Sequence, residues 1–281
     1  MSTRGAVHSA PVASRCGRLA LSILVMVFFV ALRHGSIARG AEPRPLRVLS
    51  YNIHHGEGLD GRVDLGRIAE VINAASPDIA LLQEVDRYLP RSGNIDQARD
   101  LGQATGMHVA FGANLTVAHG GYGNAILSRF QLTNTANLRL PGSPSGEPRG
   151  VLGADVTLPD SFGATTLRIL VTHLDHLPPD TDRLRAIDEI NRCAEQEGRL
   201  VVIGGDFNAT SQSAVLSRFR DTWTLVGDGE HPTFPAMMPQ RQIDFIGYRS
   251  PTRVSVGDVI VLDEAVASDH RPLFASMWLS R

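Results

Sequence analysis

The chain has 281 residues, of which 43% are hydrophobic and 20% are charged, and its formal net charge is −2 at pH 7. This composition is typical of a globular protein, and it excludes a disordered chain, a collagen-like rod and a polytopic membrane protein. All 27 basic residues are arginine, which excludes any reaction that needs a Schiff-base lysine or a P-loop lysine.

The first forty residues have the order of a secretory signal. Arginines precede an apolar run, Leu19–Leu32, and the small-x-small sequence Ala38–Gly40 follows it. The run is shorter than the roughly 20 residues that span a bilayer. We therefore predict that residues 1–40 are a signal peptide and that the protein is exported to the periplasm or the extracellular space. An uncleaved N-terminal membrane anchor is the alternative.

The remaining segment, residues 41–281, is predicted to be a single domain, because no linker divides it. Five of the 27 arginines lie in residues 1–40, which contain no acidic residue, so 22 arginines face 29 acidic residues in the remaining segment. This acidic balance argues against a general binder of duplex nucleic acid. The one cysteine of this segment, Cys193, cannot form an internal disulfide or a cysteine zinc cluster. We predict that it is a small core residue.

Apolar runs bounded by turn residues predict nine buried strands. These strands alternate with helical patterns in the first half of the chain and again after Asp180. Between these two regions the strands follow one another without a helix. This order favours a two-sheet α/β sandwich with helices outside. The predicted strands are Leu46–Tyr51, Ile79–Glu84, Ala125–Ser128, Val151–Thr157, Leu167–Thr172, Leu200–Gly204, Ile243–Tyr248, Val254–Val261 and Leu273–Trp278.

Two helices are predicted from apolar residues at helical spacing after a capping aspartate. The first begins at Asp64 and has its apolar face within Leu65–Ile72. The second begins at Asp180 or Asp182 and turns the apolar residues of Leu184–Cys193 inward.

Polar side chains that can bind a cation or a phosphate occur at the ends of several predicted strands. Each of them alone has an ordinary structural interpretation, such as a turn or a solvated strand end. Together they indicate a site, because strand ends hold side chains rigidly at a shared rim. These residues are Asn52, Glu84, His173, Asp175, Asp206, Asn208, Asp244, Asp269 and His270.

Seven short motifs contain these polar residues, and their order along the chain makes them specific for one kind of protein. They are SYNIHHG, LLQEV, GNAILSR, THLDH, GGDFNA, QIDFIGY and SDHRP. In this order they resemble the endonuclease/exonuclease/phosphatase superfamily, and the resemblance extends from about Leu46 to Trp278. It implies a four-layer α/β sandwich, with two packed mixed β-sheets flanked by helices. It also implies hydrolysis of a phosphate ester by an activated water molecule.

The resemblance assigns three residues to a divalent-cation site: Glu84 as the main ligand, Asn52 beside it, and Asp269 directly or through water. A hard cation such as Mg²⁺ prefers oxygen ligands from one or two carboxylates. We therefore expect Mg²⁺ as the cofactor, with Mn²⁺ or Ca²⁺ as alternatives.

The same resemblance implies the catalytic roles. Asp206 matches the carboxylate that orients and deprotonates the attacking water. Asn208 matches the amide that holds a phosphate oxygen or the nucleophile. His270 would bind the phosphoryl group, while Asp244 fixes its tautomer and raises its basicity. His173 would either hydrogen-bond the phosphate or protonate the leaving group.

Three further residues are candidate substrate-binding residues: Asn124, Arg149 and Asp175. Arg149 could clamp a phosphate or pair with Glu147, and Asp175 could be catalytic or structural. Arg183 is expected to be a solvated helix residue.

Other imidazoles lie near these motifs. His54, His55 and His119 do not have a spacing that indicates a metal site.

The sequence thus favours an exported, divalent-metal-dependent phosphodiesterase or phosphatase. A small-molecule or lipid-headgroup phosphate ester is favoured as the substrate, because the segment is acidic and has no arginine-rich run. A secreted nuclease that cleaves DNA or RNA is one alternative, and a catalytically silent binding module on the same fold is another. We expect a monomer without a protein partner.

Overall fold

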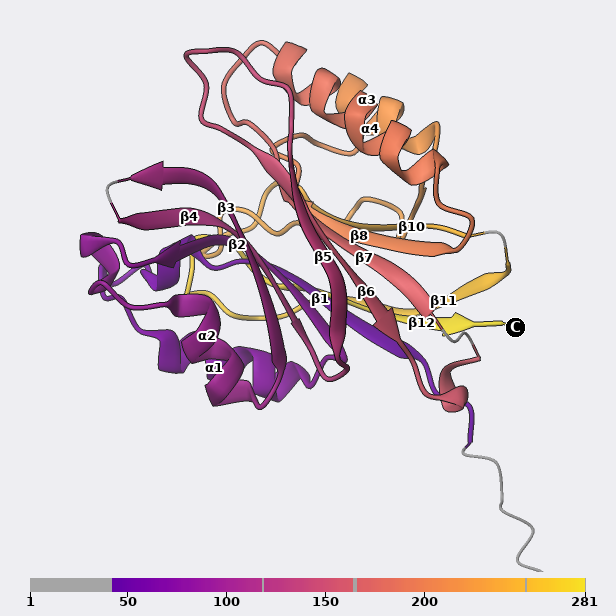
Figure 1. Ribbon diagram of the computed structural model, residues 1–281. Helices are drawn as coiled ribbons and strands as arrows, with labels where there is room; N and C mark the ends of the chain where they lie inside the picture. Colours follow the sequence, from indigo (N-terminus) through magenta and orange to yellow (C-terminus); the bar gives the residue numbers. More distant parts are fainter. Residues whose placement is uncertain (1–41, 118, 164–165, 251, 281) are drawn as a thin grey trace, which may run out of the picture. The chain divides into compact units, whose positions relative to one another are not determined.

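Two β-sheets of six strands each pack face to face at the centre of the fold (Figure 1). The computed structural model describes residues 42–117, 119–163, 166–250 and 252–280. The predicted signal peptide or anchor, residues 1–40, lies outside the described residues.

The first sheet has the strand order β11-β12-β1-β2-β4-β3. Strands β1 and β2 run parallel, and every other neighbouring pair is antiparallel. The carboxyl ends of β1 and β2 therefore lie side by side at one edge of this sheet. Its strands are β1 (Leu46–Asn52), β2 (Ile79–Arg87), β3 (His108–Val117), β4 (Gly120–Ser128), β11 (Val254–Val261) and β12 (Leu273–Leu279).

The second sheet has the order β5-β6-β7-β8-β10-β9 and is built in the same way. Here β7 and β8 are the parallel pair, so their carboxyl ends also meet. Strand β10 runs antiparallel to β8 and begins where β8 ends, with Asp244 opposite Asp206. The strands are β5 (Leu132–Arg139), β6 (Gly150–Thr157), β7 (Thr166–His173), β8 (Leu200–Asp206), β9 (Thr224–Leu225) and β10 (Asp244–Arg249).

Helices cover the outer face of each sheet, which gives the predicted four layers. Helices α1 (Leu65–Ala75) and α2 (Gln97–Thr105) cover the first sheet, and α3 (Thr181–Glu195) and α4 (Ala214–Arg220) cover the second (Figure 1). Three single-turn 3₁₀ helices complete the set, at His54–Gly56, Pro90–Ser92 and Asp160–Phe162.

In the described residues, no helix is both long enough and apolar enough to cross a membrane.

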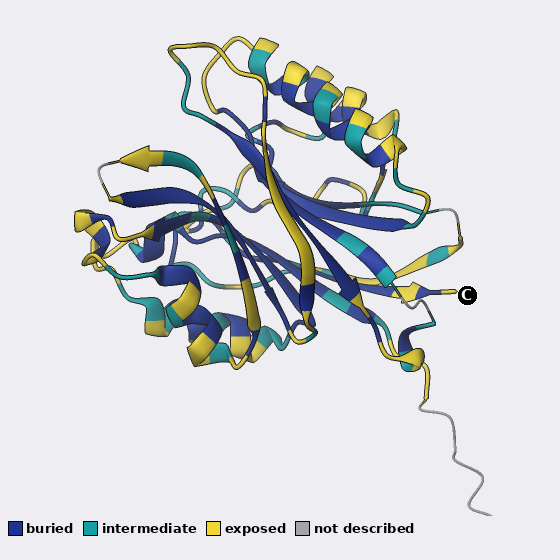
Figure 2. Ribbon diagram, viewed as in Figure 1, coloured by how far each residue is buried: buried dark blue, intermediate teal, exposed yellow. Residues whose placement is uncertain are grey.

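The central strands are largely apolar because both of their faces are buried, whereas β11, which was predicted to be a buried strand, is largely exposed at the edge of its sheet. Along β1, Val48 packs into the cluster between the sheets, whereas Leu49 and Tyr51 pack against α1 and α2. Along β8, Val202 faces the other sheet and Val201 faces α3 and α4. Figure 2 shows the result: most residues of the central strands are buried, while the helices expose their outer sides.

Three strands and two helices of the described residues were not predicted from the sequence. The edge strand β5 has the polar sequence LTNTANLR and buries only its first residue, so it carries no apolar pattern to detect. Strand β3 is also largely exposed at an edge, and β9 has two residues. Helices α2 and α4 are short, at nine and seven residues, and each presents only a few apolar side chains.

Three residue predictions in these elements are wrong. Glu84 does not end its strand, since β2 continues to Arg87 through a bulge. Cys193 is half-buried on α3 and not a core residue. Arg183 is buried and not solvated, because its guanidinium donates to the backbone carbonyls of Asp175 and Leu177 at the start of α3.

Candidate active site

A polar cleft of about 560 Å³ lies where the carboxyl ends of both parallel strand pairs meet. The residues that line it come from β2, β7 and β8 and from the loops before β10 and β12. Among those singled out in the sequence, the cleft is lined by Glu84, Arg149, His173, Asp206, Asn208, Asp269 and His270. The fold therefore brings together side chains that are up to 186 positions apart, from Glu84 to His270.

Glu84 owes its orientation to the bulge in β2. The strand register shifts between Leu82 and Val85, and Glu84 takes a left-handed backbone conformation with φ of 58°. A bulge re-aims a side chain, and strained residues of this kind are frequent at ligand sites. The half-buried carboxylate of Glu84 accepts a hydrogen bond on Oε1 from Asn52 Nδ2 at 2.9 Å.

Asn52 is placed differently from the oxygen ligand that the sequence predicted. Its Nδ2 donates to both Glu84 Oε1 and Asp206 Oδ2, at 2.9 and 3.1 Å. Its Oδ1 is used by the backbone N–H of His54, at 3.1 Å. In this arrangement the fully buried amide links the two carboxylates as a donor.

Asp206 lies at the end of β8, buried to 1% exposure, with both oxygens held in place. Oδ1 accepts from the backbone N–H of Asn208 at 2.8 Å, and Oδ2 accepts from Asn52. Burial raises the pKa of Asp206, and the charge of His270 opposes this shift. A buried carboxylate with a raised pKa is more basic than a solvated one, which suits the acceptance of a proton from water.

His173 is a buried, neutral imidazole. Burial and then the charge of Arg149 lower its pKa well below the ordinary value. Arg149 Nη1 lies 3.1 Å from His173 Nδ1, and Asn208 Nδ2 lies 3.1 Å from His173 Nε2. Both of these neighbours are hydrogen-bond donors, and Asp206 Oδ2 lies 3.5 Å from Nε2. Of the two roles predicted for His173, hydrogen bonding to a phosphate oxygen therefore fits better than proton donation.

His270 pairs with Asp244 as predicted. The distance from His270 Nδ1 to Asp244 Oδ2 is 2.9 Å, and Thr233 Oγ1 donates to the same oxygen at 2.6 Å. His270 Nε2 lies 3.6 Å from Asp206 Oδ2. Burial opposes the charged form, but the carboxylates of Asp244 and Asp206 outweigh burial and raise the pKa of His270 to about 10. At neutral pH this imidazole is a cation with one N–H facing the cleft.

We expect Asp244→Asn to lower the pKa of His270 in the metal-free protein. The substitution removes a negative charge and a charge-assisted hydrogen bond from Nδ1, both of which favour the imidazolium. An NMR titration of the His270 ring in excess EDTA measures the shift. An unchanged His270 titration would mean that Asp244 does not stabilise the cation.

Of the remaining predicted residues, one lines the cleft and two do not. Asp269 lines the cleft, with its Oδ1 3.4 Å from Ser268 Oγ. Asn124 is buried behind the cleft, where its Nδ2 donates to the carbonyl of Gly150. Asp175 is not among the residues that line the cleft and lines a neighbouring pocket instead. A direct contact of Asn124 or Asp175 with a substrate in the cleft is not supported by these positions.

Of the two roles that the sequence left open for Arg149, the pairing with Glu147 is confirmed, and phosphate binding stays a prediction. Arg149 lines the cleft, and it also forms an ion pair with Glu147 at 2.7 Å.

Several residues that line the cleft escaped sequence reasoning. Apart from Tyr122, they lie in loops or in the 3₁₀ turns, where the sequence has no periodic pattern. Tyr122 lies in β4, directly before the GNAILSR motif. The residues missed are His54, His55, Arg91, Tyr122, Glu147, His176, Phe234, Arg241 and Ile243.

The donor set of the cleft fits a hard divalent cation. Glu84 receives one hydrogen bond on Oε1, and among the described residues no donor is hydrogen-bonded to its Oε2. The carboxylate of Asp269 lines the same cleft. Two partly exposed carboxylates that keep free oxygens are the ligands that Mg²⁺ prefers, with water at its other positions.

Comparisons with known proteins agree with this geometry. A family model described as the Endonuclease/Exonuclease/phosphatase family matches residues 49–270. The protein YbhP of Escherichia coli K12 is 25% identical over 248 residues, which is 83% of this chain and 96% of YbhP.

Two solved structures share the fold. An endonuclease/exonuclease/phosphatase from Beutenbergia cavernae superposes with a TM-score of 0.70 at 24% identity, over 84% of this chain and 72% of that one. The mannosyl-6-phosphatase Bt3783 of Bacteroides thetaiotaomicron superposes with a TM-score of 0.68 at 19% identity, over 83% of this chain and 100% of that one.

Proposed function

The chain belongs to the endonuclease/exonuclease/phosphatase family, whose members are hydrolases that act on phosphate esters, and from this premise we propose a more specific activity. The protein is an exported, divalent-metal-dependent phosphodiesterase or phosphatase whose substrate is a small-molecule or lipid-headgroup phosphate ester. The observation that carries this proposal is the buried Asp206 between a cationic His270 and a neutral His173, open to a cleft.

The size and charge of the cleft support a small substrate. A volume of about 560 Å³ is in the usual range for small-molecule sites. Three arginines line it, Arg91, Arg149 and Arg241, and a guanidinium binds a phosphate with two parallel hydrogen bonds. The structural neighbour from Bacteroides thetaiotaomicron is a mannosyl-6-phosphatase, which is in keeping with a phosphorylated sugar or a similar compact substrate.

The first step is attack of a water molecule on phosphorus. Asp206 accepts a proton from the water, and the backbone N–H of Asn208 together with Asn52 fixes the carboxylate for this transfer. A bound divalent cation, held by Glu84 and Asp269, would neutralise charge on the phosphoryl oxygens and on the leaving oxygen.

The chain's own donors bind the phosphoryl oxygens in the transition state. His270 presents Nε2–H with a positive charge, and Arg149 and Asn208 place N–H donors beside the neutral ring of His173. Donors fixed before the reaction stabilise developing negative charge without reorganisation. Because the pKa of His270 is about 10, this cation persists across the neutral range.

Export is proposed from the sequence of residues 1–40 alone. The mass of the protein recovered from the expressing cells reports whether these residues are removed.

A substrate panel tests the proposed activity. The purified full chain is assayed with Mg²⁺ against sugar phosphates, phosphoinositides, sphingomyelin, bis-p-nitrophenyl phosphate and plasmid DNA, and with EDTA as the control. We expect hydrolysis of a small or lipid substrate, its loss in EDTA, and no nicking of DNA. Efficient cleavage of DNA would instead establish the nuclease. Failure with every substrate and metal would favour the silent binding module.

A further inference from the structure

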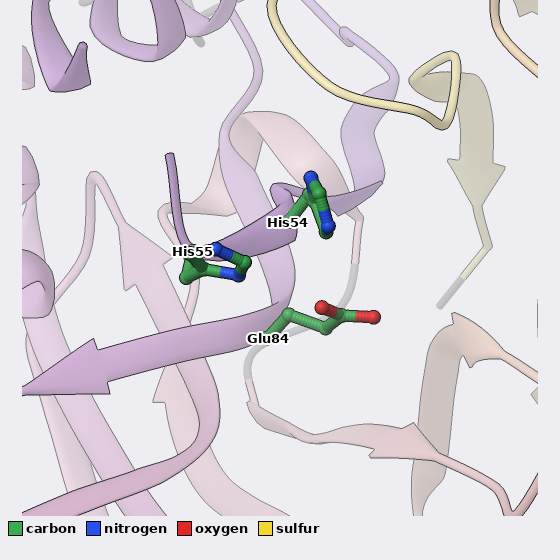
Figure 3. Close-up of side chains that lie close together, drawn as sticks. All are labelled: His54, His55 and Glu84. Carbon is green, nitrogen blue, oxygen red and sulfur yellow. The ribbon is translucent and has the colours of Figure 1, made fainter. Parts of the chain in front are cut away.

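Two adjacent histidines of the SYNIHHG motif lie beside Glu84 at the end of the cleft. His54 and His55 form the short 3₁₀ turn after β1, and both have left-handed backbone conformations, with φ of 45° and 44°. One ring nitrogen of each histidine and one carboxylate oxygen of Glu84 all lie within 4.8 Å of one another. Figure 3 shows the two imidazoles and the carboxylate around one common space.

Glu57 fixes the tautomer of both imidazoles. His54 Nδ1 lies 3.0 Å from the backbone carbonyl of Glu57, and His55 Nε2 lies 3.3 Å from its carboxylate Oε2. Both oxygens can only accept, so the ring protons are on His54 Nδ1 and His55 Nε2. The lone pairs are therefore on His54 Nε2 and His55 Nδ1. An imidazole that donates its other N–H to a carbonyl or a carboxylate is the usual arrangement around a bound metal.

The free nitrogen of His55 has no partner within the described part of the chain. His55 is 7% exposed, and its Nδ1 is a buried atom without a hydrogen bond. An unpaired buried acceptor is unfavourable unless something binds it. Burial and then the charge of Arg91 lower the pKa of His55, so the ring is neutral and able to act as a ligand at neutral pH.

Neighbouring side chains hold the His54–His55 turn in place and neutralise a positive charge that would repel a bound cation. Gln97 Nε2 donates to the backbone carbonyl of His55 at 2.6 Å, which fixes the strained turn. The nearby guanidinium of Arg91 is bound by both oxygens of Asp86, at 2.7 and 2.8 Å. The guanidinium whose charge acts on His55 is thus already paired with a carboxylate.

We propose that His54 Nε2, His55 Nδ1 and Glu84 form a binding site for a divalent transition-metal ion, with Zn²⁺ as the representative. Two imidazoles and one carboxylate are the ligand set of catalytic zinc sites and suit first-row transition metals, whereas Mg²⁺ prefers oxygen alone. This site lies next to the Mg²⁺ site proposed at Glu84 and Asp269, and Glu84 would be a ligand in both. Only this sharing of Glu84 rests on the proposed function.

Zn²⁺ affinity tests the site without any substrate. Isothermal titration calorimetry of the untagged full chain compares wild type with His54→Gln, His55→Gln and the matched control His176→Gln. His176 is an exposed histidine that lines the same cleft but lies outside the His54–His55–Glu84 cluster. We expect each of the two cluster variants to bind Zn²⁺ at least about tenfold more weakly, in line with the effect of changes around metal ligands. The control should bind as tightly as wild type.

Visible absorption of the Co²⁺-loaded protein provides a second measurement. Wild type and His176→Gln should give the bands of imidazole-coordinated Co²⁺, and His54→Gln should lose them. If the buried His55→Gln variant does not fold, the half-buried His54→Gln decides the outcome. Equal Zn²⁺ affinity and equal Co²⁺ spectra in wild type and folded His54→Gln would overturn this inference alone. Absence of phosphate-ester hydrolysis would overturn the proposed function alone, because neither binding measurement depends on turnover.

Discussion

Glu84→Gln should lower phosphate-ester hydrolysis at least about 10³-fold at saturating Mg²⁺. A bound cation contributes several kcal/mol of transition-state stabilisation, and each 1.36 kcal/mol is a tenfold change in rate. Glu84 is the carboxylate that the bulge in β2 turns into the cleft with one oxygen free of hydrogen bonds in the described structure. The amide has a similar size but loses the negative charge that holds the cation. Initial rates measured over a range of Mg²⁺ concentrations provide the test.

The control makes the same substitution, Glu to Gln, at a position outside the cleft. Glu70→Gln replaces an exposed glutamate of α1 that does not line the cleft, and it should hydrolyse substrate at the wild-type rate. Circular dichroism and the melting temperature establish that Glu84→Gln is folded. Full activity of folded Glu84→Gln, or of wild type in excess EDTA, would remove Glu84 or the cation from the mechanism.

Asp206→Asn should lower kcat at least about 10²-fold with little change in KM, since general bases typically contribute 10²–10⁴-fold. The substitution keeps the shape of the side chain, and the hydrogen bond from the backbone N–H of Asn208 to Oδ1 can persist. It removes the lone pair on the second oxygen, which faces Asn52, His173 and His270. A loss confined to kcat identifies an interaction that exists only in the transition state.

Two measurements separate the loss of the base from a general loss of structure. Asp188→Asn changes an exposed aspartate of α3 outside the cleft and should leave both kcat and KM unchanged. In Asp206→Asn, binding of inorganic phosphate should be retained, because the groups that hold the phosphoryl oxygens remain. Near-wild-type kcat in Asp206→Asn would show that another group activates the water.

The sequence by itself determined the layers of the fold and half of the polar residues that line the cleft. Buried strands such as β1 and β8 are detectable because apolar side chains must fill both of their faces. The polar residues that end them, such as Asp206, stand out against these runs, and parallel strands place their carboxyl ends at the same edge. The amphipathic face and the capping Asp64 similarly predicted α1, where the Asp64 side chain accepts from the backbone N–H of Arg67.

Only the tertiary structure decided where the contacts between these residues form. The orientation of Glu84 depends on the bulge in β2, which arises from pairing with β4. The neutral state of His173 depends on burial and on Arg149, a residue 24 positions away. The nearness of His54 and His55 to Glu84 depends on a left-handed turn. Bulges, burial and contacts between distant residues are determined by packing of the whole chain, and local periodicity carries no information about them.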